Sequence, residues 1–274
     1  TARRGRARAL LAAARAARTG RGVIHSAGQV RVSSPILINE ILRPTHNGCC
    51  QPLLCRGEDG ELYYVKGRQT NRHSVCAEWL CAHLAQAFGL PIAPFALVEM
   101  TEDVLAYALP EHRTVGVGLA FASRHIQPAV PVKAPLRKQP PTALQADILA
   151  FDWWVKNMDR SAGNPNLLWN PVQQGGVIVI DHNLAFDPAF VGADFKTQHI
   201  FANCAAMLWQ AIGEPQRRAL CLRMQAAWRQ VSSTWSMPAE WAWCNAECDV
   251  SGDFDQSAAW AILQRCHADD FWED

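Results

Sequence analysis

The chain has 274 residues, and 49% of them are hydrophobic, which excludes an intrinsically disordered protein. It carries 26 Lys plus Arg against 25 Asp plus Glu, for a formal net charge of +1. Residues 1–22 hold seven Arg and no acidic residue, so 19 basic and 25 acidic residues remain in 23–274. The body of the chain is therefore mildly acidic, which argues against direct binding of nucleic acid.

The basic stretch of residues 1–22 is not expected to be part of the folded domain. Its longest apolar run, Ala9–Ala14, is interrupted by Arg15 and is short for a secretory signal. We predict a disordered extension, with a segment that binds anions, nucleic acid or a partner as the alternative. The uncharged stretch Thr197–Gly213 contains polar residues such as His199, so it predicts a buried helix and no membrane span.

Ten cysteines are scattered along the chain without a C-x-x-C pair. A chain of this length builds a core without disulfides, so we expect free buried thiols and a reducing, cytoplasmic setting. The alternative is a zinc site formed by Cys244, Cys248, Cys266 and His267.

Alternating apolar residues and turn signals predict a β-rich first part. Residues 48–66 are typical of a hairpin that turns at Glu58-Asp59-Gly60 and returns along Leu62–Lys66. Two further strands are predicted at Ile92–Glu99 and Val115–Ala122.

One helix interrupts these strands, from Ser74 as N-cap to Phe88, and Gly89 closes it. On this helix, Glu78 shares one face with three small residues, Cys81, Ala82 and Ala85. Small neighbours would let the helix approach a sheet closely and place the carboxylate against it.

Composition changes after this part. Five prolines within residues 128–141 indicate an extended connection. Apolar spacing then predicts a helix from Thr142, followed by a short hairpin of Asn166–Trp169 and Val177–Ile180. The remainder, from about Thr197 on, is predicted to be mostly helical.

Three features carry the chemistry. Lys66 ends a strand and precedes a helix with Glu78, Asp159 is followed five positions later by Asn164, and Asp181 stands directly after a buried strand. Phosphoryl transfer uses such a set: Lys66 contacts the α/β-phosphates, Glu78 braces Lys66, and Asp159 accepts the proton of the attacking hydroxyl. Asn164 and Asp181 supply the oxygen ligands that Mg²⁺ prefers.

The spacing D-x-x-x-x-N equals that of the protein-kinase catalytic loop, H-R-D-L-x-x-x-N. Asn157 and Met158 occupy the positions of the motif's His and Arg, and His182-Asn183 follows Asp181 in place of Phe-Gly. Because the predicted strands and helices are segregated along the chain, we predict an α+β fold with two lobes. Its parts are the basic extension 1–22, a nucleotide-binding β-rich N-lobe with one helix at 23–127, the connection 128–141 and a helical C-lobe with the catalytic loop at 142–274.

Over about residues 36–190 the chain resembles the HipA-like kinases, particularly their smaller members. The matching stretches are Y-Y-V-K-G, A-E-W-L-C-A-H-L-A-Q-A-F-G-L-P-I-A-P, D-W-W-V-K-N-M-D-R-S-A-G-N-P-N-L-L and V-I-D-H-N-L-A-F. The resemblance implies a bilobal kinase-like fold, ATP and Mg²⁺, and phosphorylation of Ser or Thr on a protein, including autophosphorylation. It also implies, for some members, a toxin held by an antitoxin that has a DNA-binding domain.

The phosphate-binding loop departs from the protein-kinase pattern G-x-G-x-x-G. The first candidate is His46–Gln51, with Gly48 as its one glycine, and the second is the polar loop Gly67–Ser74. By position, Phe121–Arg124, with Phe121 and Ser123, is expected to form the adenine-binding hinge.

Several assignments stay open at this level. Arg160 could bind substrate, brace the catalytic loop or form a structural salt bridge, Asn166 could be only a turn residue, and His182 is expected to pack or hydrogen-bond. A small-molecule or phosphoinositide kinase is the alternative enzyme, since phosphoinositide kinases also have a D-R-x-x-x-N loop. A catalytically inactive pseudokinase that binds a partner is the alternative outside enzymes.

Overall fold

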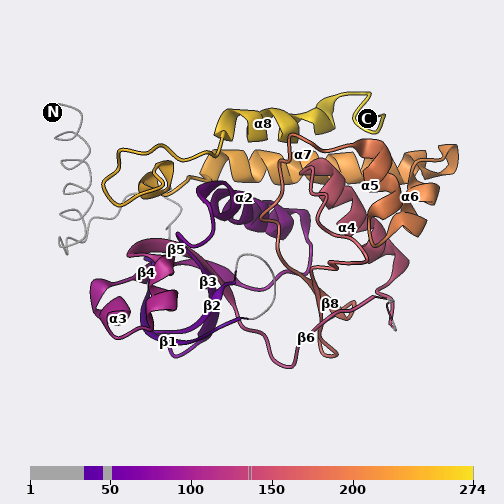
Figure 1. The fold of residues 1–274 in the computed structure, drawn as a ribbon. Coiled ribbons are helices and arrows are strands. Elements are labelled where there is room, and N and C mark those ends of the chain that lie inside the picture. The colour runs from indigo at the N-terminus through magenta and orange to yellow at the C-terminus, as the bar shows by residue number, and fades with distance from the viewer. Residues whose placement is uncertain (1–33, 46–50, 135, 137, 274) are drawn as a thin grey trace, which may run out of the picture.

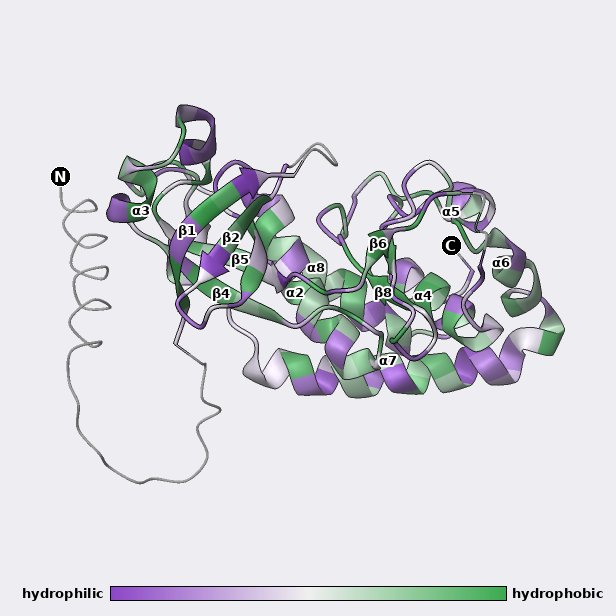
Figure 2. Cartoon of the chain, turned by 90° about the horizontal axis from the view of Figure 1, so that it is seen from below, coloured by the Kyte–Doolittle hydropathy of each residue, from purple (hydrophilic) through white to green (hydrophobic). Residues whose placement is uncertain are grey.

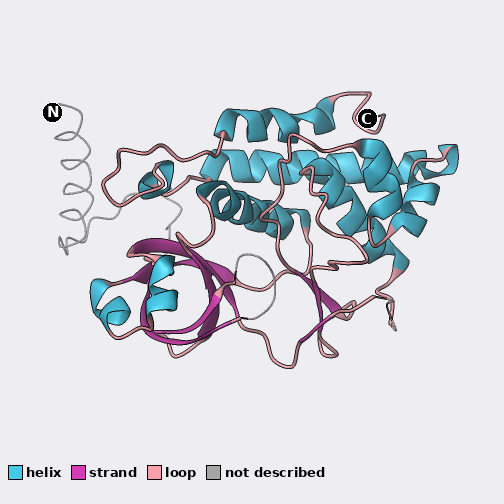
Figure 3. Cartoon of the chain, in the orientation of Figure 1, coloured by secondary structure: helices cyan, strands magenta, loops and turns pink. Residues whose placement is uncertain are grey.

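The structure is a computed structural model that describes residues 34–45, 51–134, 136 and 138–273. Five strands form a closed barrel in the order β1-β2-β3-β5-β4 (Figures 1 and 3). They are β1 (Ile36–Pro44), β2 (Leu53–Gly57), β3 (Leu62–Lys66), β4 (Phe95–Met100) and β5 (Gly118–Arg124). Neighbouring strands are antiparallel, except that β1 and β4 close the barrel in parallel.

The predicted hairpin is present as β2 and β3, which pair from Leu53 with Val65 to Arg56 with Leu62. Its turn contains Gly60 at φ +80°, a left-handed conformation that glycine adopts without steric cost. Strands β4 and β5 lie near the predicted ranges. Strand β1 was not predicted.

Helix α2 (Arg72–Phe88) lies between the barrel and the long helix α7 (Glu214–Thr234) (Figure 1). The expected N-cap, Ser74, is wrong: Asn71 caps the helix, because its side chain accepts from the backbone N–H of Ser74. Gly89 ends the helix at φ +91°, as predicted. A buried cluster that includes Leu80, Leu84 and Phe88 joins α2 to the helices that follow.

The Pro-rich connection contains a strand that the sequence analysis did not predict. This strand, β6 (Val130–Pro131), pairs with β7 (Leu167–Trp169), and β7 pairs with β8 (Val177–Val179) in a small sheet. The predicted hairpin of β7 and β8 is confirmed, as is the helix α4 (Thr142–Trp154).

The remaining residues are mainly helical. The helices are α5 (Gly192–Gln198), α6 (Ala202–Leu208), α7 (Glu214–Thr234) and α8 (Gln256–Gln264), and a short α3 (Glu102–Ala106) lies between β4 and β5. The described part of the chain also has four 3₁₀ turns, which are Pro110–Val115, Ala211–Gly213, Ala239–Ala242 and Arg265–His267. Hydrophobic and hydrophilic residues alternate along α7 (Figure 2), and its buried side includes Leu220, Met224 and Trp228.

The single helix expected over Thr197–Gly213 is wrong, since α5 ends and α6 begins within that stretch. His199 leaves the helical path, and the backbone N–H of Ile200 donates to the carbonyl of Arg160. Within the described ranges, no helix is both long and apolar enough to cross a membrane.

The eight cysteines in the described part of the chain are free, and five of them are buried. Cys244 is exposed, in contrast to the expectation of buried thiols. Among the described residues, no group of three or more His, Cys, Asp or Glu side chains could hold a metal ion, so the zinc alternative at Cys244, Cys248, Cys266 and His267 finds no support.

Candidate active site

Lys66, Glu78 and Asp181 come together although they lie on three separate elements. Lys66 ends β3, Glu78 lies in the second turn of α2, and Asp181 follows β8. The Lys66 Nζ lies 3.1 Å from Glu78 Oε2 and 2.7 Å from Asp181 Oδ1. The side chains of Lys66 and Glu78 are each 10% exposed, whereas that of Asp181 is 31% exposed. The group therefore opens toward solvent on the Asp181 side.

Local sequence explains how Glu78 reaches this position. Its three small neighbours on the helix, Cys81, Ala82 and Ala85, are all buried, as expected for a close approach. Glu78 Oε2 also accepts from the backbone N–H of His182 at 3.1 Å. One carboxylate thus ties α2 both to the barrel and to the segment after β8.

The charges of this group are strongly coupled. Burial disfavours the charged form of Lys66, but Glu78 and Asp181 outweigh burial and raise the pKa of the ammonium. Burial and the nearby Asp181 raise the pKa of Glu78 to about 7, against the opposing effect of Lys66. Burial likewise opposes ionisation of Asp181, but Lys66 outweighs it and lowers the pKa of that carboxyl. Near neutral pH, Lys66 is charged and Asp181 is ionised.

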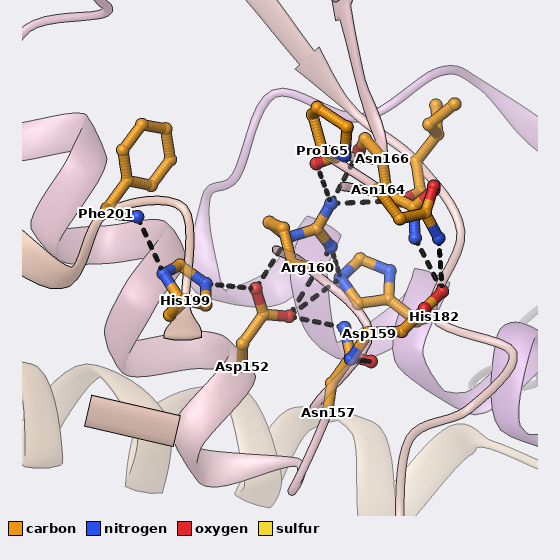
Figure 4. A network of polar contacts seen from close by, with 11 residues as sticks. Asp152, Asn157, Asp159, Arg160, Asn164, Pro165, Asn166, His182, His199 and Phe201 are labelled. Atoms are coloured by element: carbon orange, nitrogen blue, oxygen red, sulfur yellow. Dashed lines mark hydrogen bonds and ion pairs between the residues drawn. The ribbon is translucent and has the colours of Figure 1, made fainter. Parts of the chain in front are cut away.

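The predicted catalytic loop forms a second cluster around Asp159. Asp159 Oδ2 accepts from the side-chain amides of Asn164 at 2.8 Å and Asn166 at 2.9 Å (Figure 4). Because both amides donate through nitrogen, both amide oxygens remain as acceptors or metal ligands. Asn166 was expected to serve as a turn residue, and it is in the left-handed region at φ +47°. Its contact with Asp159 was missed, and the available signal was its place two residues after Asn164.

Backbone hydrogen bonds join this loop to the strand that precedes Asp181. The N–H of Ile180 donates to the carbonyl of Asn166 at 3.1 Å, and Arg160 Nη1 donates to the carbonyl of Ile180 at 3.2 Å. Asp181 itself has φ +61°, a left-handed conformation for a non-glycine residue. This turns the chain from β8 toward Lys66.

The residues predicted to contact the nucleotide are not all brought together with Lys66, Glu78 and Asp181. Gly48 lies outside the described residues. Phe121 and Ser123 lie within β5, and the Phe121 ring is 2% exposed and packs on Trp79 and Phe95. The Phe121 ring is therefore part of the core, and the adenine-binding hinge at Phe121–Arg124 stays a prediction.

The oxygen donors fit a hard divalent cation. Asp181 offers a partly exposed carboxylate, and the exposed Asn164 offers an amide oxygen, both of the ligand type that Mg²⁺ prefers. The ammonium of Lys66 lies beside Asp181, where it could face a phosphate group held by the cation.

The solved structures that resemble this chain include kinases. The proinflammatory kinase CtkA of Helicobacter pylori has a TM-score of 0.50 and 12% identity, over 85% of this chain and 92% of CtkA. The Golgi casein kinase has a TM-score of 0.49 and 13% identity, over 87% of this chain and 73% of that kinase. The same kinase with Mn/ADP bound has a TM-score of 0.46 and 12% identity. The similarity to CtkA shows a shared mixed α/β fold.

Curated protein sequences gave no match. The model of the HipA-like kinase family, in contrast, matches residues 38–274, which is most of the chain and includes all of the side chains described above. The chain therefore belongs to the HipA-like kinase family.

Proposed function

We propose that this kinase uses ATP and Mg²⁺ to phosphorylate Ser or Thr residues of a protein, including its own. The observation that carries the proposal is the position of Lys66, which bridges Glu78 and Asp181 beside the Asp159 loop. In this proposal the barrel and α2 belong to an N-lobe over residues 23–127. The segment 128–141 connects it to a helical C-lobe over residues 142–274, and residues 1–22 are an extension.

Each side chain has one task in the proposed mechanism. Lys66 binds the α/β-phosphates, and Glu78 holds its ammonium at the end of β3. Asn164 and Asp181 would hold Mg²⁺, which when bound neutralises charge on the phosphates. Asp159 orients the substrate hydroxyl and accepts its proton, while Asn166 helps to fix the carboxylate.

The phosphate-binding loop and the base-binding segment belong to the proposal as well. Gly48 and the polar loop Gly67–Ser74 are the candidates for backbone contacts to phosphate. The base is expected near Ser123 and the residues that follow β5, because these lie where the barrel leads into the connection.

A transfer assay with γ-labelled ATP tests the proposal. Wild-type protein should label itself or a protein acceptor in the presence of Mg²⁺, and Asp159→Asn should abolish labelling while it still binds Mg-ATP. Asp194→Asn, a change at an exposed aspartate of α5, is the matched control and should keep full activity.

The acceptor panel should include proteins, phosphoinositides and small molecules. Labelling of a lipid or a small molecule alone would show that the substrate is not a protein. Thermal stabilisation by Mg-ATP without phosphate transfer would show that the protein is a pseudokinase, which binds the nucleotide but does not catalyse. A cytoplasmic location and an antitoxin partner are further parts of the proposal, and co-purification of a small DNA-binding protein from the native host would support the second.

A further inference from the structure

A buried carboxylate lies behind the catalytic loop. Asp152, on α4, is 0% exposed and accepts four hydrogen bonds (Figure 4). Its donors are Asn157 Nδ2 at 2.8 Å, Arg160 Nε at 2.6 Å, Arg160 Nη2 at 3.4 Å and His199 Nε2 at 3.1 Å. Burial opposes ionisation, but Arg160 and His199 outweigh it and keep the pKa of Asp152 below its ordinary value. The carboxylate at the base of the loop is therefore ionised near neutral pH.

Arg160, the residue after Asp159, forms an ion pair with Asp152 and also donates hydrogen bonds to the loop. Its guanidinium is fully buried, so it cannot contact a substrate. Nη1 donates to the carbonyls of Pro165 at 3.4 Å, Asn166 at 2.5 Å and Ile180 at 3.2 Å. Pro165 and Asn166 directly follow Asn164, and Ile180 directly precedes Asp181. One planar group thus holds both segments that carry the proposed metal ligands.

His182 extends the network to α2. Its Nε2 lies 3.1 Å from Arg160 Nη2, and its backbone N–H donates to Glu78. His199 also holds Asp152 in place. Its Nδ1 accepts from the N–H of Phe201, which leaves Nε2 to donate to Asp152. A continuous set of hydrogen bonds therefore runs from α4 through the catalytic loop to Glu78 and Lys66.

A buried ion pair contributes little to stability by itself, because desolvation of both charges offsets their attraction. It fixes geometry well, since a guanidinium with every donor engaged has only one favourable orientation. We propose that Asp152 and Arg160, with His182 and His199, are positioning residues that hold Asp159, Asn164 and Asp181 in register with the Lys66–Glu78 pair. This inference rests on the proposed kinase function and deepens it. In this view the buried carboxylate of Asp152 sets the relative positions of the catalytic side chains.

Two variants and one control test this role. Asp152→Asn keeps the shape of the side chain and removes its charge, and Arg160→Lys keeps the charge and removes the planar fork. Asp147→Asn is the matched control, because Asp147 lies on the same helix and loses an ion pair with Arg223 (2.6 Å) away from the site. Steady-state kinetics should be measured per folded molecule, together with hydrogen exchange of residues 159–166.

Both network variants should lower kcat on the order of tenfold to a hundredfold, with the KM for ATP changed by less than about threefold. Exchange in 159–166 should become faster in both. Asp147→Asn should lower the melting temperature and leave kcat and exchange unchanged. Where a network variant does not fold, His199→Phe, which keeps a flat ring and removes one of the four bonds to Asp152, should lower kcat at least about threefold.

Unchanged kcat in a folded network variant, with only a lower melting temperature, would overturn the positioning role. The same result for His199→Phe would also overturn it. Absence of phosphate transfer by the wild-type protein on every acceptor would instead overturn the proposed function, so the two failures are distinguishable.

Discussion

The carboxylate of Glu78 lies 3.1 Å from the ammonium of Lys66 at a place where each side chain is only 10% exposed. Removal of the cation alone would leave a buried carboxylate facing Asp181 without compensation. Loss of one partner of a buried pair is strongly destabilising, whereas loss of both partners can be nearly neutral. Stability and activity should therefore respond differently to changes in this pair.

Lys66→Met should lower the free energy of unfolding by about 3 kcal/mol, and Lys66→Met/Glu78→Gln should recover at least half of that loss. Both variants should reduce phosphate transfer on the order of a hundredfold or more, because the phosphates lose their cation. Urea unfolding and transfer kinetics measure the two effects. Activity that recovers together with stability in the double variant would contradict the role of Lys66 in phosphate binding.

The two asparagines that contact Asp159 should separate metal binding from orientation. Asn164→Ala removes an exposed amide oxygen proposed to bind Mg²⁺, so it should raise the Mg²⁺ concentration for half-maximal activity about tenfold. Asn166→Ala removes a hydrogen bond to Asp159 but no proposed Mg²⁺ ligand, so it should lower kcat by about threefold to thirtyfold. Its Mg²⁺ requirement should remain that of the wild type. Mg²⁺ titrations at saturating ATP distinguish them, and an equal change in Mg²⁺ requirement for both variants would refute the division of roles.

Local patterns in the sequence predicted most of the parts that position the site. The β2–β3 hairpin, the α2 helix with its Gly89 end, the start of α4 and the β7–β8 hairpin each depend on residues close together in the chain. The pairing of Lys66 with Glu78 was predicted from their order along the chain and the needs of phosphoryl transfer, and the small residues beside Glu78, which the structure buries as expected, supported it. The N-cap was misplaced by three residues because Asn71 and Ser74 are both good caps, and only geometry decides between them.

The features that were missed depend on contacts between distant segments. Strand β1 lacks clear alternation around Asn39 and Glu40, and it is held by pairing with β2 and β4. The two-residue strand β6 exists only because β7 lies beside it. Arg160 is held by Asp152, His182 and carbonyls from two segments, and no spacing in the sequence encodes that set.

A pH effect on stability should come from His83, which lies on α2 and packs against Phe95 of β4. The ring lies edge-on to Trp79 and Phe95, and its Nε2 has no hydrogen-bond partner among the described residues. Burial lowers the pKa of His83 from 6.5 to about 4. Between these values the unfolded chain binds a proton that the folded chain does not, so His83 contributes to stability above pH 6.5 and this contribution is lost toward pH 4.

His83→Phe keeps an aromatic ring in this place and removes the titration. Between pH 7 and pH 4.5 the wild type should lose about 1–2 kcal/mol more stability than the variant, a value reduced to allow for solvent at the partly accessible ring. Urea unfolding at the two pH values measures the difference. Equal losses in both proteins would show that His83 titrates alike in the folded and unfolded states.

The last prediction concerns the tryptophans that anchor the C-terminal segment to α4. Trp153 is fully buried, and its indole N–H donates to the carbonyl of Phe271 at 3.0 Å. Trp153→Phe leaves that carbonyl unpaired. The matched control is Trp235, which is 9% exposed and whose indole nitrogen has no hydrogen-bond partner in the described ranges.

Trp235→Phe therefore removes ring volume without breaking a hydrogen bond. The free energy of unfolding should fall about 1–3 kcal/mol further in Trp153→Phe than in Trp235→Phe, because only the former leaves a buried acceptor unsatisfied. Urea unfolding measures both values. Hydrogen exchange should locate the additional loss at residues 265–273, since Phe271 would no longer be tied to α4. Equal destabilisation by the two substitutions would mean that ring packing, and not this hydrogen bond, holds the end of the chain against α4.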